Sequence, residues 1–172
     1  MSTAIEKSKK KTGSRDHWAT PQHLFDEWNR EFNFTIDVCA SKENHKHLRY
    51  WTEEDDALAM PWAGETWFCN PPYSQLYDWT YTARLETSDL TSSGVMLVPC
   101  STETRWFHEC VLPFAVGIRL LRTRVEFIPS VEYVIKRRAE GKPETSGNMW
   151  PSMLVVYGKR LEKTKNLWRF RP

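Results

Sequence analysis

Apolar residues recur at helical spacing in three stretches of the chain. In the first, over residues 24–32, they lie three or four positions apart, which predicts a helix with one face on the core. Thr20 is the expected N-cap of this helix, and Pro21 is its expected first residue. The second helix is predicted to begin near Ser74, and the third covers residues 102–112.

Short apolar runs between these stretches predict the strands of one sheet. The run at residues 94–100 is apolar throughout, which is typical of a strand buried on both faces. The other predicted strands cover residues 34–40, 48–51, 66–69, 116–121, 124–128 and 153–157. Strands that alternate with helices indicate an α/β fold with a mostly parallel, doubly wound sheet. Because only a polar insertion, residues 129–150, separates the last two strands, we expect the last strand to be antiparallel.

The remaining segments divide the chain into one domain and two tails. With 172 residues, the chain is long enough for a single domain with a sizeable core. Residues 1–15 are polar and basic, so we expect a disordered tail there and the domain over residues 16–158. Residues 159–172 form a second basic tail, and the body between the two tails is acidic. Basic tails attract phosphates without reading sequence, although a merely solvated tail is the alternative.

Composition excludes several classes of protein. No apolar run approaches the roughly 20 residues that span a bilayer, and no signal-peptide core is present, so we expect a cytoplasmic protein. The four cysteines form no C-x-x-C pair, and His45 and His47 have no cysteine or acidic cluster beside them. We therefore expect reduced cysteines and no metal site.

The predicted strand at residues 66–69 runs directly into Asn70-Pro71-Pro72-Tyr73. The two prolines fix two φ angles and remove two donors, which makes a stiff turn whose carbonyls can point into a cleft. The Asn70 side-chain oxygen and the Pro71 carbonyl could accept the two hydrogens of an amino group and localise its lone pair. Tyr73 offers a flat face on which a base could stack. The motif thus indicates methylation of an amino group; the alternative is a stiff loop with a packed tyrosine.

Further segments match one family in the same order along the chain. They are Trp18 with Thr20-Pro21, Asp37-Val38-Cys39-Ala40, Asp56-Ala57-Leu58 before Pro61-Trp62, Asn70-Pro71-Pro72-Tyr73-Ser74, Thr104-Arg105-Trp106-Phe107-His108, Arg124 with Phe127, and Pro151-Ser152. On these segments, residues 16–158 resemble the phage- and prophage-type DNA N6-adenine methyltransferases, the Dam family. The resemblance implies a single-domain, Rossmann-like methyltransferase fold that uses S-adenosylmethionine and releases S-adenosylhomocysteine.

For function, the resemblance implies methyl transfer to adenine N6 at specific sites in double-stranded DNA, with base flipping, in the cytoplasm of a bacterial host. It places the cofactor near Trp18, Thr20, Pro21, Asp37, Cys39, Ala40, Asp56, Leu58 and Asn70. Expected at the DNA are Ser74, Arg105, His108, Arg124 and, in the insertion as a candidate target-recognition segment, Lys136, Arg137 and Arg138. The turn Cys39-Ala40-Ser41 departs from the glycine-rich turn usual in such folds, which leaves the seat of the cofactor open.

Other interpretations of these features stay open. Asn70 to Tyr73 alone fit methylation of cytosine N4, of adenine in RNA or of a protein glutamine. Basic tails with aromatic residues fit a non-catalytic nucleic-acid-binding module. Asp37 is alternatively an N-cap, and the basic residues of the insertion are alternatively a solvated charge run. No pattern specifies the oligomeric state or a recognition sequence such as GATC.

Overall fold

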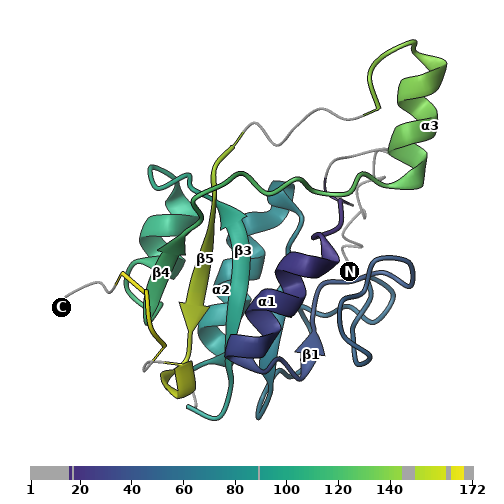
Figure 1. The fold of residues 1–172 in the computed structure, drawn as a ribbon. Coiled ribbons are helices and arrows are strands. Elements are labelled where there is room, and N and C mark those ends of the chain that lie inside the picture. Colours follow the sequence, from purple (N-terminus) through teal and green to yellow (C-terminus); the bar gives the residue numbers. More distant parts are fainter. Residues whose placement is uncertain (1–15, 17, 89, 145–149, 162–163, 169–172) are drawn as a thin grey trace, which may run out of the picture.

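A five-stranded sheet with helices on both faces forms the body of the protein (Figure 1). The computed structural model describes residues 16, 18–88, 90–144, 150–161 and 164–168, and every structural statement below concerns these residues. The prediction of a disordered tail at residues 1–15 lies outside them. No helix within the described ranges is long and apolar enough to cross a membrane.

The sheet combines parallel and antiparallel pairing. It consists of β1 (Ile36–Asp37), β2 (Thr66–Cys69), β3 (Ser93–Pro99), β4 (Gly117–Leu120) and β5 (Ser152–Tyr157), in the spatial order β1-β2-β3-β5-β4. β1, β2 and β3 are parallel neighbours, whereas β5 runs antiparallel to both β3 and β4. Every residue of β3 and β5 is buried, as their continuous apolar runs predict. The α/β class with an antiparallel last strand is therefore confirmed.

Two helices cover the sheet and a third stands apart from it (Figure 1). They are α1 (Gln22–Phe32), α2 (Leu76–Glu86) and α3 (Val131–Ala139). The buried side chains Phe25, Trp28 and Phe32 place α1 against one face of the sheet. Trp79 and Ala83 place α2 against the opposite face. Both helices follow the predicted apolar spacing, because a helix is held to the core by its apolar stripe.

The predicted strand at residues 124–128 is wrong. The last strand, β5, has β3 on one side and β4 on the other, so neither of its edges is left for this segment. The chain instead crosses above the ends of the strands on its way from β4 to α3 (Figure 1). Val125 is buried in the core on the way, and Ile128 makes an isolated antiparallel bridge with Ala19.

Several predicted elements are shorter or differently bounded. The strand at residues 34–40 is reduced to β1, and residues 48–51 supply only a bridge from Tyr50 to Asp37. Pro21, not Thr20, is the N-cap of α1.

The third predicted helix, residues 102–112, is largely a π-helical turn at Phe107–Val111. There the Leu112 N–H donates to the Phe107 carbonyl, and the Cys110 carbonyl accepts from the Tyr157 hydroxyl at 3.1 Å. The Tyr157 hydroxyl, from a strand distant in the chain, thus takes the place of a helical backbone N–H as the donor to Cys110. The spacing of apolar residues does not reveal such a partner.

The polar insertion and the basic C-terminal segment also contain ordered elements. The insertion at residues 129–150 holds α3, with Ser130 accepting a hydrogen bond from the Tyr133 N–H as a side-chain cap. Within residues 159–172, Trp168 pairs with Ile118 at the edge of the sheet, and Leu167 packs against the core. This part of the predicted C-terminal tail therefore belongs to the folded body.

Candidate active site

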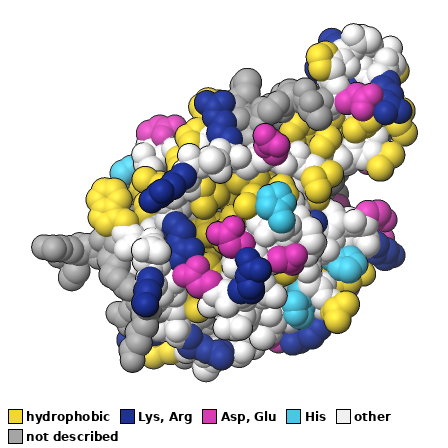
Figure 2. Space-filling view, viewed as in Figure 1, with side chains coloured by type: hydrophobic (Ala, Val, Ile, Leu, Met, Phe, Trp, Pro, Cys, Tyr) yellow, Lys and Arg dark blue, Asp and Glu magenta, His cyan; other side chains and the backbone are white. Residues whose placement is uncertain are grey.

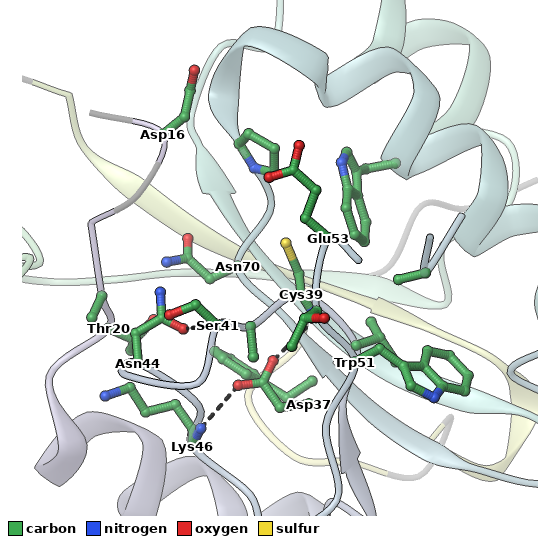
Figure 3. Close-up of a pocket in the computed structure, with 18 of the residues that line it drawn as sticks. Asp16, Thr20, Asp37, Cys39, Ser41, Asn44, Lys46, Trp51, Glu53 and Asn70 are labelled. Carbon is green, nitrogen blue, oxygen red and sulfur yellow. Dashed lines mark hydrogen bonds between the residues drawn. The ribbon is translucent and has the colours of Figure 1, made fainter. Parts of the chain in front are cut away.

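A cavity of about 750 Å³ lies where the chain leaves β1 and β2 (Figure 3). Four segments form most of its wall: Asp16 with residues 18–20, residues 37–46, residues 51–58, and the turn that begins at Asn70. The carboxyl ends of adjacent parallel strands meet at this edge, which is where ligands bind in open α/β sheets. The fold thus brings the two sequence motifs expected to bind cofactor and substrate to one cavity.

Asn70 is held in a fixed orientation at the rim of this cavity. Its Nδ2 donates a hydrogen bond to the Trp18 carbonyl oxygen over 3.2 Å. A carbonyl can only accept, so the amide nitrogen must face Trp18 and the Oδ1 atom is left as an acceptor. Pro72 also lines the cavity, whereas Pro71 is buried and is not among the lining residues. The sequence motif therefore presents an oriented acceptor at the end of β2.

Tyr73 lies beside the cavity and does not line it. Its ring packs edge-on against Phe127, with centroids 6.2 Å apart. Burial raises the pKa of the Tyr73 hydroxyl above its usual range. The phenol is therefore protonated at neutral pH. Stacking of a base on Tyr73 stays a prediction.

The segment formed by Asp16 and residues 18–20, here called the N-terminal strap, closes one side of the cavity. The Asp16 carboxylate accepts hydrogen bonds from the Ser74 N–H at 3.2 Å and from the Ser74 hydroxyl at 2.8 Å. Ala19 exchanges two backbone hydrogen bonds with Ile128, at 2.8 and 2.9 Å. The strap is thus fastened both to the turn after the motif and to the segment that leads into α3.

The strap also contacts α3 directly. The Trp18 ring meets the buried Tyr133 ring edge-on at 5.0 Å. Of the residues predicted to bind the cofactor in this segment, Trp18 and Thr20 line the cavity and Pro21 does not. The Thr20 hydroxyl is buried and has no hydrogen-bond partner among the described residues. Such a group in a cavity wall is costly unless a ligand or water satisfies it.

Asp37 braces the loop that forms the cavity floor. Its carboxylate accepts from the backbone N–H of Cys39 at 3.2 Å and of Lys46 at 3.0 Å. No helix follows Asp37, so the alternative role as an N-cap is wrong. Burial raises the pKa of Asp37 to about 6, although the two backbone hydrogen bonds and the positive charge of Lys46 oppose the rise. The bracing holds Cys39 and Ala40 in the wall without a glycine-rich turn.

The raised pKa of Asp37 predicts a pH-dependent stability. Between about pH 4 and pH 6 the unfolded chain loses the Asp37 proton and the folded chain retains it, so the free energy of unfolding should fall as the pH rises. Above about pH 6 this contribution should be constant, with a total loss of about 2–3 kcal/mol. Denaturant titrations of the wild type and Asp37→Asn at several pH values test this. The difference between the two proteins should change across that window; parallel profiles would contradict the assignment.

The remaining predicted cofactor residues also reach the cavity. Asp56 and Leu58 line it from the loop after Trp51, as predicted. Residues that sequence patterns did not indicate line it as well: Asp16, Asn44, Lys46, Trp51 and Glu53. They lie in irregular loops, where no apolar period shows which way a side chain points.

None of the residues predicted to contact DNA lines the cavity. Ser74 is bound to Asp16, and Arg105 pairs with Glu109 at 2.8 Å while lying over the Tyr77 ring. His108 and Arg124 are exposed, and Arg124 lies on the segment that crosses above the strand ends.

Two of the three cations on α3 are engaged locally. Arg138 pairs with Glu144 at 2.6 Å, and Arg137 donates to the Pro143 carbonyl at 2.9 Å. Lys136 is exposed and has no partner among the described residues. On the same helix Val131 and Ile135 are largely exposed, and Figure 2 shows apolar side chains beside charged ones on this projecting segment. In the described chain no group of three or more His, Cys, Asp or Glu side chains could hold a metal ion.

Comparisons with known proteins point to one family. The family model for DNA N-6-adenine-methyltransferase (Dam) matches residues 7–167. The chain is 31% identical over 155 residues to a DNA N-6-adenine-methyltransferase of Haemophilus phage HP1 (strain HP1c1), a match that covers 89% of this chain and 84% of the phage protein. It is 37% identical over 65 residues to the Escherichia coli (strain K12) protein YfdM, covering 34% of this chain and 71% of that protein.

Proposed function

Because this chain belongs to the DNA N-6-adenine-methyltransferase (Dam) family, we propose that it transfers a methyl group from S-adenosylmethionine to adenine N6 at specific sites in double-stranded DNA. The α/β sheet with its antiparallel last strand is consistent with a methyltransferase fold. The observation that carries the proposal is Asn70, whose acceptor oxygen is oriented by Trp18 at the rim of the cavity.

The cavity suits S-adenosylmethionine in size and chemistry. Its volume of about 750 Å³ is within the range of small-molecule sites. Cys39 and Ala40 are small enough for a ligand to approach the backbone, and the unpaired Thr20 hydroxyl offers a polar contact. Asp56, which the family resemblance places near the adenine ring, lines the wall together with Leu58. When bound, S-adenosylmethionine supplies a methyl group activated by a positively charged sulfonium.

Asn70 and Pro71 act on the amino group of the substrate. The Asn70 Oδ1 and the Pro71 carbonyl each accept one amino hydrogen, which draws the lone pair of the nitrogen out of conjugation with the ring. The Trp18 carbonyl keeps the Asn70 amide from rotating, so the acceptor is in position before the substrate arrives. Most of the rate should therefore come from positioning and electrostatics, with no covalent enzyme intermediate.

The target adenine has to leave the DNA stack to reach these acceptors, because its N6 atom is paired within the duplex. Flipping costs a few kcal/mol. Stacking on Tyr73, worth roughly 1–3 kcal/mol, would offset part of this cost. The protonated Tyr73, supported by Phe127, is the residue we assign to that contact.

One assay tests the proposed reaction. The protein is incubated with methyl-labelled S-adenosylmethionine and unmethylated DNA, RNA or protein, and the labelled product is identified after digestion. Label in N6-methyladenine from duplex DNA is the expected result. Label in N4-methylcytosine, in RNA or in a glutamine would move the activity to one of the alternative substrates. Nucleic-acid binding without label in any product would favour the non-catalytic binding module.

Unpaired cations outside the cavity should contribute to DNA affinity. Arg124 and Lys136 have no partner in the described part of the chain, so each can neutralise one phosphate. Arg124→Ala and Lys136→Ala should each weaken DNA binding several-fold at low salt and lower the slope of log K against log salt by about 1. Arg138→Ala is the matched control, because its guanidinium already pairs with Glu144. Equal effects of all three substitutions in binding titrations would contradict this distinction.

A further inference from the structure

One end of the cavity carries an ammonium group that forms no direct ion pair with a described residue. Lys46 lines the cavity and is half-buried, and its ammonium has no hydrogen bond or ion pair with a described residue. Figure 3 shows its side chain reaching the same end of the cavity as Asn44 and Thr20. Burial lowers the pKa of Lys46, while Asp37 and Asp26 favour its charged form.

A further group at this end can donate a hydrogen bond. The buried Thr20 hydroxyl lines the cavity and lacks a partner among the described residues. Thr20 also stands two residues before the first residue of α1, and a helix start carries a partial positive charge. A cation and a free hydroxyl thus occur together at one end of the cavity.

The nearby acidic side chains do not pair with the Lys46 ammonium. Asp37 already accepts two backbone N–H groups below the cavity, and the exposed Asp26 accepts from Gln22. A ligand that fills this end must therefore bring its own anionic group. In S-adenosylmethionine the carboxylate is the only anion, whereas the ammonium and the sulfonium would both be repelled by Lys46.

We propose that Lys46 is the counter-cation for the carboxylate of S-adenosylmethionine, with the Thr20 hydroxyl as the accompanying donor. The identity of the ligand rests on the proposed function, and the role of Lys46 rests on the cavity. This assignment also orients the ligand. With the carboxylate at Lys46, the adenosine extends toward Trp51 and Glu53 at the other side of the cavity, and the sulfonium lies between them near Asn70 (Figure 3).

Binding measurements on the full chain test the proposal without a catalytic readout. Calorimetric titrations compare S-adenosylmethionine with decarboxylated S-adenosylmethionine, which lacks only the carboxylate. Lys46→Ala should weaken binding of the first ligand about 10- to 100-fold and change binding of the second less than about twofold. Lys46→Arg should restore most of the affinity for S-adenosylmethionine, since it restores the charge.

Lys142→Ala is the matched control, because it removes a lysine that lies outside the cavity and whose ammonium already pairs with Glu140 at 3.0 Å. Circular dichroism shows whether each variant folds. If Lys46→Ala weakens both ligands equally, or neither, the proposal is overturned. If the wild type binds neither ligand, the proposed cofactor is wrong, which is a separate failure.

Discussion

Asn70→Ala is expected to lower the rate of methyl transfer by about 10²- to 10³-fold, the size of effect seen when one oriented electrostatic contact is removed from an active site. The substitution removes the only side-chain acceptor of the motif that is fixed by a hydrogen bond to Trp18. Single-turnover assays with labelled S-adenosylmethionine measure the loss. The fold should survive, because the lost hydrogen bond is worth only about 1 kcal/mol.

Asn70→Asp tests the orientation of the acceptor separately from its presence. Aspartate keeps acceptor oxygens but cannot donate to the Trp18 carbonyl, so its side chain should turn away from that oxygen. We expect an activity between those of the wild type and the alanine variant, with unchanged circular dichroism. If Asn70→Ala retained more than a tenth of the activity, Asn70 would not be the acceptor that the mechanism requires.

Gly94→Ala is expected to cost about 3 kcal/mol of stability, one of the largest effects available in the core. A Cβ atom at this position of β3 would lie 2.0 Å from the Trp67 ring. The ring cannot easily move, because Trp67 is fully buried, donates to the Ser92 hydroxyl at 3.1 Å and packs against Trp62. Urea denaturation of both proteins measures the difference in the free energy of unfolding.

Gly141→Ala is the control for this substitution. Gly141 has a φ of +64°, and a Cβ there would meet nothing within 4 Å. Only backbone strain should appear, at about 1 kcal/mol. If Gly94→Ala were no more destabilising than Gly141→Ala, the contact with Trp67 would not limit the packing of β2 against β3.

Local patterns predicted the elements whose formation depends on local residues. β2 coincides with its predicted range, and α1 and α2 follow the spacing of Phe25, Trp28 and Trp79. Residues 124–128 have the composition of a strand, yet β5, the strand expected to follow them in the sheet, pairs with β3 and β4 instead. Which strand lies between two others is decided by competition between segments that are distant in the chain. The sequence of one segment alone does not show the outcome.

The candidate site shows the same division. Asn70 and its prolines were predicted because their chemistry is contained in four adjacent residues. Lys46 and Asp16 were not predicted. Asp16 contacts Ser74, a partner distant in the chain, and Lys46 lies in an irregular loop. Most of the residues predicted to bind the cofactor line the cavity. The residues predicted to contact DNA lie outside the cavity and form no part of its wall.

The N-terminal strap determines when, during folding, the site becomes complete. Trp18 lies 52 residues from Asn70, and Asp16 lies 58 residues from Ser74. Each contact closes a long loop of the chain, which costs conformational entropy. That cost is offset only after the sheet between the two ends of the loop has formed. A fragment restricted to β2 and its motif would therefore contain both amino-group acceptors but not the Trp18 carbonyl that orients Asn70. Catalytic competence should consequently appear as a late, cooperative property of the whole chain.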